Sequence, residues 1–142
     1  MIKQIVTGVD DSATAYAAAL RAAELAVALD ADLRLVSAYG KFESERLEAG
    51  TEAILVTTEQ SAYGLAGSVQ ARIRRELPTA RITISAESGK PADAMVRVAN
   101  DLSADLIVVG NRRVQGPTRV LGSIARDVAA HAPCDVYVVH TN

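Results

Sequence analysis

Apolar residues along this chain alternate between short strand-like runs and longer stretches with the spacing of a helix face. The first run, Ile5–Val9, ends at the polar triplet Asp10-Asp11-Ser12. A helix is predicted after the triplet, because apolar side chains recur there at helical spacing: Tyr16, Leu20, Ala23 and Val27. The chain therefore opens with a strand that passes directly into a helix.

The same order is repeated twice more. Leu33–Ala38 predicts a second strand, and the helix predicted after it stops at Pro78, with apolar residues along one face: Leu65, Val69, Ile73 and Leu77. Arg81–Ala86 alternates apolar and polar residues, which is typical of a strand near a sheet edge with one exposed side. Gly89-Lys90-Pro91 then opens a third helix, because proline is favoured in a first helical turn.

The C-terminal part completes the pattern. Leu106–Val109 has four consecutive apolar residues, which predicts a strand buried on both faces at the sheet centre. Ser123–His131 is predicted as a helix and Val136–His140 as a fifth strand. Strands joined by helical crossovers predict an α/β fold, with five parallel strands in a doubly wound, Rossmann-like sheet of order 3-2-1-4-5 and helices on both faces.

One segment does not follow the pattern. Residues 40–58 form a connection that is longer than usual and contains both apolar and acidic residues. Three interpretations stay open for it: a lid, a surface for a partner, and an extension of a helix.

Composition narrows the class of protein. The chain has 142 residues, 49% of them hydrophobic and 23% charged, which suits a single core in one domain over residues 1–142. The net charge of −2 and the pI near 5.7 provide no electrostatic basis for binding nucleic acid or an anionic membrane. The N-terminus lacks the apolar core of a signal peptide, and no apolar stretch approaches the roughly 20 residues of a membrane span. We therefore expect a cytoplasmic protein.

Little in the sequence points to catalysis or to a resident metal. His131 falls in the last turn of a predicted helix and His140 ends a strand, so both are interpreted as structural. Ser12 and Ser123 have no base beside them in sequence and are interpreted as helix caps. Cys134 is predicted to be a small buried hydrophobe. We expect a protein that is not an enzyme.

The fold predicts where a ligand would bind. In open α/β sheets, ligands bind beyond the carboxyl ends of the strands, where the strand order reverses. Here that point falls between strands one and four, and it brings together the ends of strands one and two and the loop before the last helix: Val9, Asp10, Asp11, Ser12, Ala38, Tyr39 and Gly110–Ser123. One cleft is expected to hold all the candidate chemistry.

The loop at Gly110–Ser123 has the composition of a phosphate site. Its glycines at 110, 116 and 122 permit tight turns and close backbone approach, and the free N–H groups at the start of the following helix attract an anion. No acidic residue lies between 110 and 126, and positive charge comes from Arg112, Arg113, Arg119 and Arg126. The alternative is that the glycines only end a strand and begin a helix while the arginines are solvated.

At these residues the sequence resembles the universal stress protein family. The signature of that family is Gly-x2-Gly-x9-Gly followed by Ser or Thr, and this chain has Gly110-Asn111-Arg112-Arg113, eight residues, and then Gly122-Ser123. The resemblance runs along the whole chain and includes Asp10-Asp11-Ser12, Gly89–Ala92 and Ala132–Val136.

The resemblance implies an adenine nucleotide as ligand, ATP or cyclic AMP, and a homodimer joined through the last strand. Asp10 would contact the ribose or the adenine, and Val9 with Ala38-Tyr39 would flank the base. Gly110, Gly122 and Ser123 would hold the phosphates. The implied nucleotide-binding set is completed by Ser12, Asn111, Arg112, Arg113 and Ile124. The protein would respond to occupancy, without turnover.

Two departures from the signature bear on the ligand. Arg113 stands at the second glycine, and the loop is one residue shorter. A left-handed backbone at Arg113 would cost about 1–2 kcal/mol, although its guanidinium could pair with a phosphate instead. Cyclic AMP, with one phosphate, needs less of the loop, and Ser37-Ala38-Tyr39 and Val139-His140-Thr141 resemble the branch of the family that binds it. The alternative is a member that has lost nucleotides and acts through protein contacts alone.

Asp10 and Asp11 form an acidic pair that is similar to the magnesium site of response-regulator receivers. The final strand ends in His140-Thr141-Asn142 without the lysine of that site, so a receiver is not the preferred interpretation. With ATP, a magnesium ion bridging Asp10 or Asp11 to the polyphosphate stays open, because such an ion needs only one protein carboxylate. The simpler interpretation is that Asp11 caps the first helix.

Overall fold

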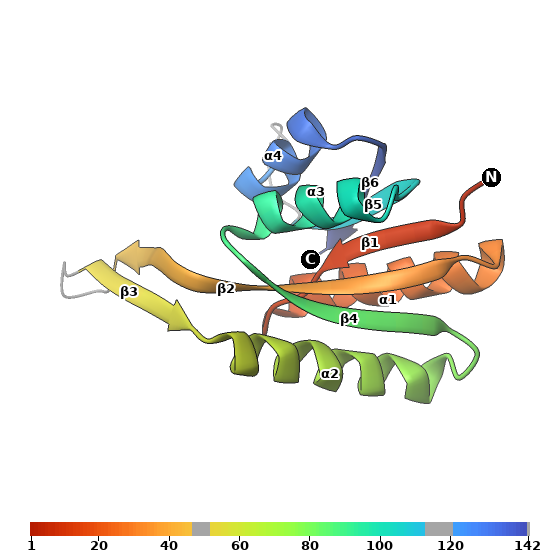
Figure 1. Ribbon diagram of the computed structural model, residues 1–142, viewed down its shortest axis with the longest axis horizontal. Helices are drawn as coiled ribbons and strands as arrows, with labels where there is room; N and C mark the ends of the chain where they lie inside the picture. Colours follow the sequence, from red (N-terminus) through yellow and green to blue (C-terminus); the bar gives the residue numbers. More distant parts are fainter. Residues whose placement is uncertain (47–51, 113–120, 142) are drawn as a thin grey trace.

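The computed structural model describes residues 1–46, 52–112 and 121–141, with the backbone alone at 41–46, 52–57 and 112 (Figure 1). Its strands are β1 (Gln4–Gly8), β2 (Asp32–Arg46), β3 (Glu52–Thr57), β4 (Arg81–Ser88), β5 (Leu106–Arg112) and β6 (Asp135–Thr141). Its helices are α1 (Ala13–Leu29), α2 (Glu59–Glu76), α3 (Pro91–Asp101) and α4 (Ser123–His131). Every predicted strand and helix is present, and β3 is an additional element.

The parallel strands form a sheet in the order β4-β2-β1-β5-β6. In the numbering of the predicted strands this order is 3-2-1-4-5, so the predicted topology is confirmed. β1 lies between β2 and β5, with Val6 opposite Arg34 on one side and Ile107 on the other. The carboxyl ends of β1 and β5 therefore lie side by side.

Helices cover both faces of the sheet (Figure 1). α1 and α2 pack against one face, around Leu33, Leu35 and Ile73. α3 and α4 pack against the other face, around Ile107 and Val128. The buried residues of α1 are all small, which lets this helix approach the sheet closely: Ala18, Ala19, Ala22, Ala23 and Ala26.

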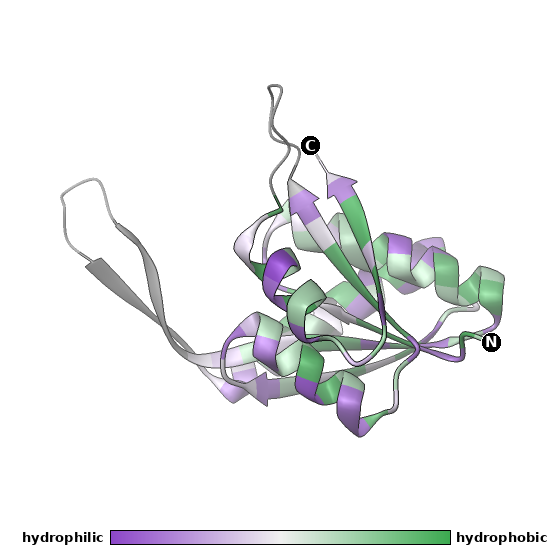
Figure 2. Ribbon diagram, turned by 90° about the horizontal axis from the view of Figure 1, so that it is seen from above, coloured by the Kyte–Doolittle hydropathy of each residue, from purple (hydrophilic) through white to green (hydrophobic). Residues whose placement is uncertain are grey.

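Burial along the strands agrees with their predicted places in the sheet. Leu106–Val109 of β5 is buried throughout, as expected for a strand covered on both faces. Among the described strands β4 pairs with β2 alone, and its first positions alternate between exposed and buried, as expected at an edge. In Figure 2 two neighbouring strands, one of which ends at the C-terminus, change from hydrophobic to hydrophilic colour at their tips. Polar residues therefore gather at the carboxyl edge.

The long connection at 40–58 contains a β-hairpin. β2 continues past its last pairing with β4, where Tyr39 lies opposite Ser88, and from Gly40 onward it pairs antiparallel with β3. Of the three open interpretations, the helix extension is therefore excluded for the described residues. The β-branched and apolar run Ile54-Leu55-Val56 is a strand signal that was available in the sequence. The lid and the partner surface stay predictions, and residues 47–51 lie outside the described residues.

The helix starts agree with the predictions in part. Ser12 is the N-cap of α1, and its Oγ accepts a hydrogen bond from the Ala15 N–H at 3.1 Å. The interpretation of Asp11 as the cap is wrong, because Ser12 is the residue with extended backbone immediately before the first turn. Pro91 is the first residue of α3, as predicted.

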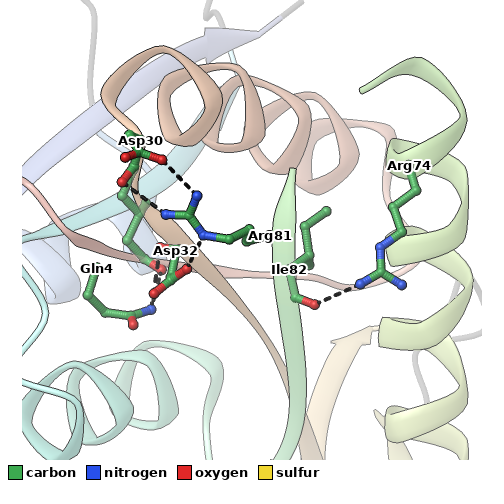
Figure 3. A network of polar contacts seen from close by, with 7 residues as sticks. Gln4, Asp30, Asp32, Arg74, Arg81 and Ile82 are labelled. Atoms are coloured by element: carbon green, nitrogen blue, oxygen red, sulfur yellow. Dashed lines mark hydrogen bonds and ion pairs between the residues drawn. The ribbon is translucent and has the colours of Figure 1, made fainter. Parts of the chain in front are cut away.

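An ion-pair network joins elements at the opposite, amino edge of the sheet (Figure 3). Arg81 Nη1 lies 2.7 Å from Asp30 Oδ1, and Arg81 Nε lies 2.7 Å from Asp32 Oδ1. The network connects the end of α1 and the start of β2 to the start of β4. The hydrogen bond from Arg81, together with the charge of its guanidinium, lowers the pKa of the Asp30 carboxyl.

Replacing Asp30 with asparagine is expected to lower stability slightly at neutral pH and not at all in strong acid. Asparagine tolerates the left-handed backbone at this position, φ 55°, so Asp30→Asn isolates the loss of charge. The charge-dependent stability of the wild type is fully present above the ordinary carboxyl pKa of 3.8 and is lost as the pH falls through the lowered folded-state pKa. Exposed ion pairs contribute little. Urea midpoints measured over a pH series check this, and a difference that does not shrink in acid would contradict it.

Candidate functional site

The end of β1 forms a tight turn into α1. Val9 is buried, and its N–H donates a 2.9 Å hydrogen bond to the Val36 carbonyl of β2. Asp10 is exposed, and its Oδ1 accepts a 2.7 Å hydrogen bond from the Ser12 N–H. This Asx turn fixes the Asp10 carboxylate beyond the carboxyl end of β1. The Ser12 hydroxyl oxygen is itself engaged as the helix cap.

β2 passes the same edge at Ala38 and Tyr39, which are both partly exposed. Gly8, the last residue of β1, lies opposite Val36, so Ala38 follows just past the end of β1. The Tyr39 carbonyl accepts a 3.0 Å hydrogen bond from the Gly89 N–H, which ties β2 to the turn that opens α3. The backbone of β2 is therefore held beside the predicted position of the ligand.

The end of β5 differs from the prediction. Gly110 does not end the strand, because it pairs with Val139 of β6 and the pairing continues to Arg112 opposite Thr141. A Cβ atom at Gly110 would lie 2.9 Å from the Thr14 carbonyl oxygen, closer than a real Cβ approaches a backbone atom. Gly110 therefore permits the close packing of α1 on β5, a role that the sequence pattern did not reveal.

The start of α4 lies across from this strand end. Gly122 is the N-cap residue, and its N–H donates a 2.7 Å hydrogen bond to Asn111 Oδ1. Ser123 is the first residue of the helix and not its N-cap, so the predicted Ser123 cap is wrong. Ile124 follows with 39% of its surface exposed. The first-turn N–H groups of α4 thus begin at the edge where β5 ends.

The arginines predicted to supply positive charge are described in part. Arg126 is exposed on α4. Arg113 and Arg119 lie outside the described residues, and Arg112 is described by its backbone alone. The described members of the predicted site lie in the turn after β1, in β2 and β5 and at the start of α4, along one edge of the sheet, as expected for a ligand site in an open α/β fold.

Two hollows in the described surface lie away from this edge. One, of about 370 Å³, lies between α3 and α4 and includes Asp93, Arg97 and His131. The other, of about 140 Å³, adjoins Asp30 and Arg81. Neither contains a predicted site residue. The candidate site is therefore identified by the convergence of strand ends and a helix start. Across the described ranges, no three His, Cys, Asp or Glu side chains are grouped as metal ligands.

The two histidines and the cysteine interpreted as structural come from α4, β6 and the turn between them. His131 is in the last turn of α4, where its Nδ1 lies 2.9 Å from the Asp127 carbonyl oxygen. His140 is exposed on β6. Cys134 is partly buried and packs against the cluster around Ile107 and Val128, which confirms its predicted hydrophobic role in part, and burial raises the pKa of its thiol. Among the described helices, none combines the length and apolar character needed to cross a membrane.

Comparison with known proteins identifies the family. Residues 1–140 match the sequence profile of the Universal stress protein family. The chain belongs to this family. Among universal stress proteins, Rv1636 of Mycobacterium tuberculosis is 33% identical over 145 residues, which cover 98% of this chain and 97% of the relative. The family resemblance seen in the sequence is confirmed.

Solved structures of universal stress proteins share the fold. A universal stress protein crystallised in complex with cAMP is 27% identical, with a TM-score of 0.69, and the match covers 99% of this chain and 98% of that one. The crystal structure of Mycobacterium tuberculosis Rv1636 is 32% identical, with a TM-score of 0.59 and coverage of 99% and 97%. A universal stress protein from Archaeoglobus fulgidus, 24% identical, has a TM-score of 0.70 and coverage of 98% and 94%.

Proposed function

We propose that this universal stress protein is a non-catalytic, cytoplasmic module that binds an adenine nucleotide, either ATP or cyclic AMP. The observation that carries the proposal is the parallel pairing of β1 with β5: Asp10 follows the carboxyl end of β1, and the N-cap of α4 is bonded to Asn111 at the carboxyl end of β5. The related universal stress protein in complex with cAMP supports this class of ligand.

The two ends of a nucleotide would meet different chemistry in this site. The Asp10 carboxylate would accept hydrogen bonds from the ribose or the adenine, and the base would lie beside Val9, Ala38 and Tyr39. The N–H groups at the start of α4 would donate to a phosphate, helped by the helix dipole. The residues proposed to complete the nucleotide site are Ser12, Gly110, Asn111, Arg112, Arg113, Gly122, Ser123 and Ile124.

Cyclic AMP and ATP make different demands on the start of α4. The Gly122 N–H already donates to Asn111 Oδ1, so the helix start has one donor fewer for a ligand. One phosphate needs fewer donors than a triphosphate, which favours cyclic AMP. With ATP, a magnesium ion would use one carboxylate, Asp10 or Asp11, and would keep several waters.

The proposed function is occupancy without turnover. Ser12 is engaged as a helix cap, and within the described residues no hydrogen bond joins His131 or His140 to Ser12 or Ser123. No histidine is therefore placed to activate these serines as nucleophiles. Binding would act by changing the state or the partners of the protein.

A homodimer through the last strand is part of the proposal. In the described sheet β6 pairs with β5 alone, so backbone N–H and C=O groups on its outer edge are available for a second strand. Tyr137, the third residue of β6, is 37% exposed. An edge strand with these features suits pairing with the same strand of a second copy.

Replacing Gly122 with leucine is expected to reduce nucleotide affinity roughly tenfold or more. A Cβ at Gly122 would lie 3.2 Å from Asn111 Oδ1, so a larger side chain would move the start of α4. Calorimetric titration with cyclic AMP, and separately with ATP and magnesium, measures the change. Gly64→Leu is the matched control, because a Cβ at Gly64 meets nothing within 4 Å. The dimer measured by sedimentation should survive both substitutions.

The outcomes separate the candidate functions. If the wild type binds one nucleotide and Gly122→Leu binds it equally well, the proposed phosphate site is wrong. If the nucleotide-free wild type binds neither nucleotide, the alternative of a family member that acts through protein contacts alone is favoured. Arg113 in place of a signature glycine, and the shorter loop, are the observations that support that alternative.

A further inference from the structure

Asn111 connects the two ends of the loop that precedes α4. It lies near the end of β5 with 8% of its surface exposed. Its Oδ1 accepts a 2.7 Å hydrogen bond from the Gly122 N–H. This bond joins the last residues of β5 directly to the N-cap of α4, without depending on the residues between them.

Asn111 is itself held from the opposite side. In the β5–β6 register it lies opposite His140, and its carbonyl accepts a 3.3 Å hydrogen bond from Thr141 Oγ1. Thr141 is buried, and its Oγ1 also lies 3.4 Å from Thr14 Oγ1 in the first turn of α1. The position of Asn111 is therefore set by β6 and α1 as well as by its own strand.

The hydrogen bond between Gly122 and Asn111 determines which N–H groups at the start of α4 are available to a ligand. Gly122 is the N-cap and has no side chain to cap the helix, and its backbone N–H donates to the oxygen of Asn111. The N–H groups that follow in the first turn have no partner inside the helix. Their direction and their distance from the end of β1 depend on how α4 is anchored at Gly122.

We propose that Asn111 is a positioning residue that fixes the start of α4 so that its first-turn N–H groups meet the ligand phosphate. This inference rests on the proposed nucleotide-binding function and names a residue on which that site depends. A neutral amide suits this place. An aspartate would accept the same hydrogen bond but would bring a negative charge close to an anionic ligand.

The first test uses the nucleotide-free protein. In the wild type, the Gly122 amide should exchange with solvent more slowly than the amides of Ser123 and Ile124, as measured by NMR hydrogen exchange. In Asn111→Ala the exchange of the Gly122 amide should accelerate about tenfold, and in Asn111→Asp its protection should be kept. Equal exchange of the three amides in the wild type would overturn the inference without any variant.

The second test separates positioning of a phosphate from a general structural role. Calorimetry compares adenosine, which has no phosphate, with whichever of cyclic AMP or ATP the wild type binds. Asn111→Ala should weaken nucleotide binding about tenfold more than it weakens adenosine binding. Asn111→Asp should weaken nucleotide binding at least as much, because of its charge. An equal loss for adenosine and nucleotide, or full nucleotide affinity in Asn111→Asp, would overturn the inference.

The two proposals fail in different ways. If the wild type binds no nucleotide, the proposed function is wrong and Asn111 positions no phosphate, while the exchange of the Gly122 amide still reports whether the bond to Asn111 forms. If the wild type binds nucleotide and Asn111→Ala binds it equally well, the function stands and the role of Asn111 is wrong.

Discussion

Replacing Gly110 with alanine is expected to lower the free energy of unfolding by about 2–3 kcal/mol. The new Cβ would lie 2.9 Å from the Thr14 carbonyl oxygen, 3.0 Å from Thr14 Cγ2 and 3.3 Å from Ala18 Cβ. The nearest of these atoms belongs to the backbone of α1, so no side-chain rotation relieves the contact. Either α1 or β5 must shift, and β5 is held on both sides by β1 and β6. Urea unfolding monitored by circular dichroism measures the change.

Gly64→Ala is the matched control for this substitution and should change stability in the opposite direction. Gly64 lies within α2, where a Cβ would meet nothing within 4 Å. Glycine inside a helix is less favourable than alanine by up to about 1 kcal/mol, so the variant should be slightly more stable. If Gly110→Ala were as stable as the wild type and lost only its nucleotide, Gly110 would serve the ligand and not the packing of α1.

Replacing Ile107 with alanine is expected to cost about 3–4 kcal/mol of stability. Ile107 is fully buried in β5, and it belongs to the cluster formed with α3 and α4, which includes Met95 and Val128. Its strand lies between β1 and β6, so the neighbouring backbone is held on both sides and has little freedom to close the cavity. Removing three carbon atoms there loses their transfer free energy and leaves a void.

Leu29→Ala provides the comparison for Ile107→Ala. Leu29 is the last residue of α1 and is 43% exposed, so its truncation should stay within about 0.5 kcal/mol of the wild type. Chemical unfolding of the two variants under the same conditions gives the two values. Similar losses at the two positions would mean that β5 is less tightly packed than its burial indicates.

The expected effects at Gly110 and Gly122 distinguish two uses of glycine in one family signature. At Gly110 the missing side chain makes room for Thr14 of α1, so substitution should act mainly on stability. At Gly122 the missing side chain leaves room for the oxygen of Asn111, so substitution should act mainly on the start of α4 and on the proposed ligand. The two roles would be separated by measuring the nucleotide affinity and the free energy of unfolding of the Gly110 and Gly122 variants.

The capping errors show why local patterns are insufficient at the site. Asp11 and Ser12 are neighbours and both are good N-cap residues, and the sequence does not say which of them has the extended backbone that precedes α1. At α4 the prediction placed the cap one residue too late, at Ser123 in place of Gly122. The serine lies one residue inside the helix, and the polar acceptor comes from Asn111 of β5 instead.

By itself the sequence determined the order of the predicted strands and helices, the parallel sheet with β1 beside β5, and the edge at which the candidate site is proposed. These features follow from the periodicity of apolar residues and from prolines and glycines, which act on neighbouring residues, and from general rules of chain connection. Only the tertiary structure revealed the antiparallel pairing of β3 with β2, the contact that requires glycine at 110 and the bond between Asn111 and Gly122. Each of these depends on atoms from separate segments whose distance is set by packing, and packing leaves no periodic trace in the sequence.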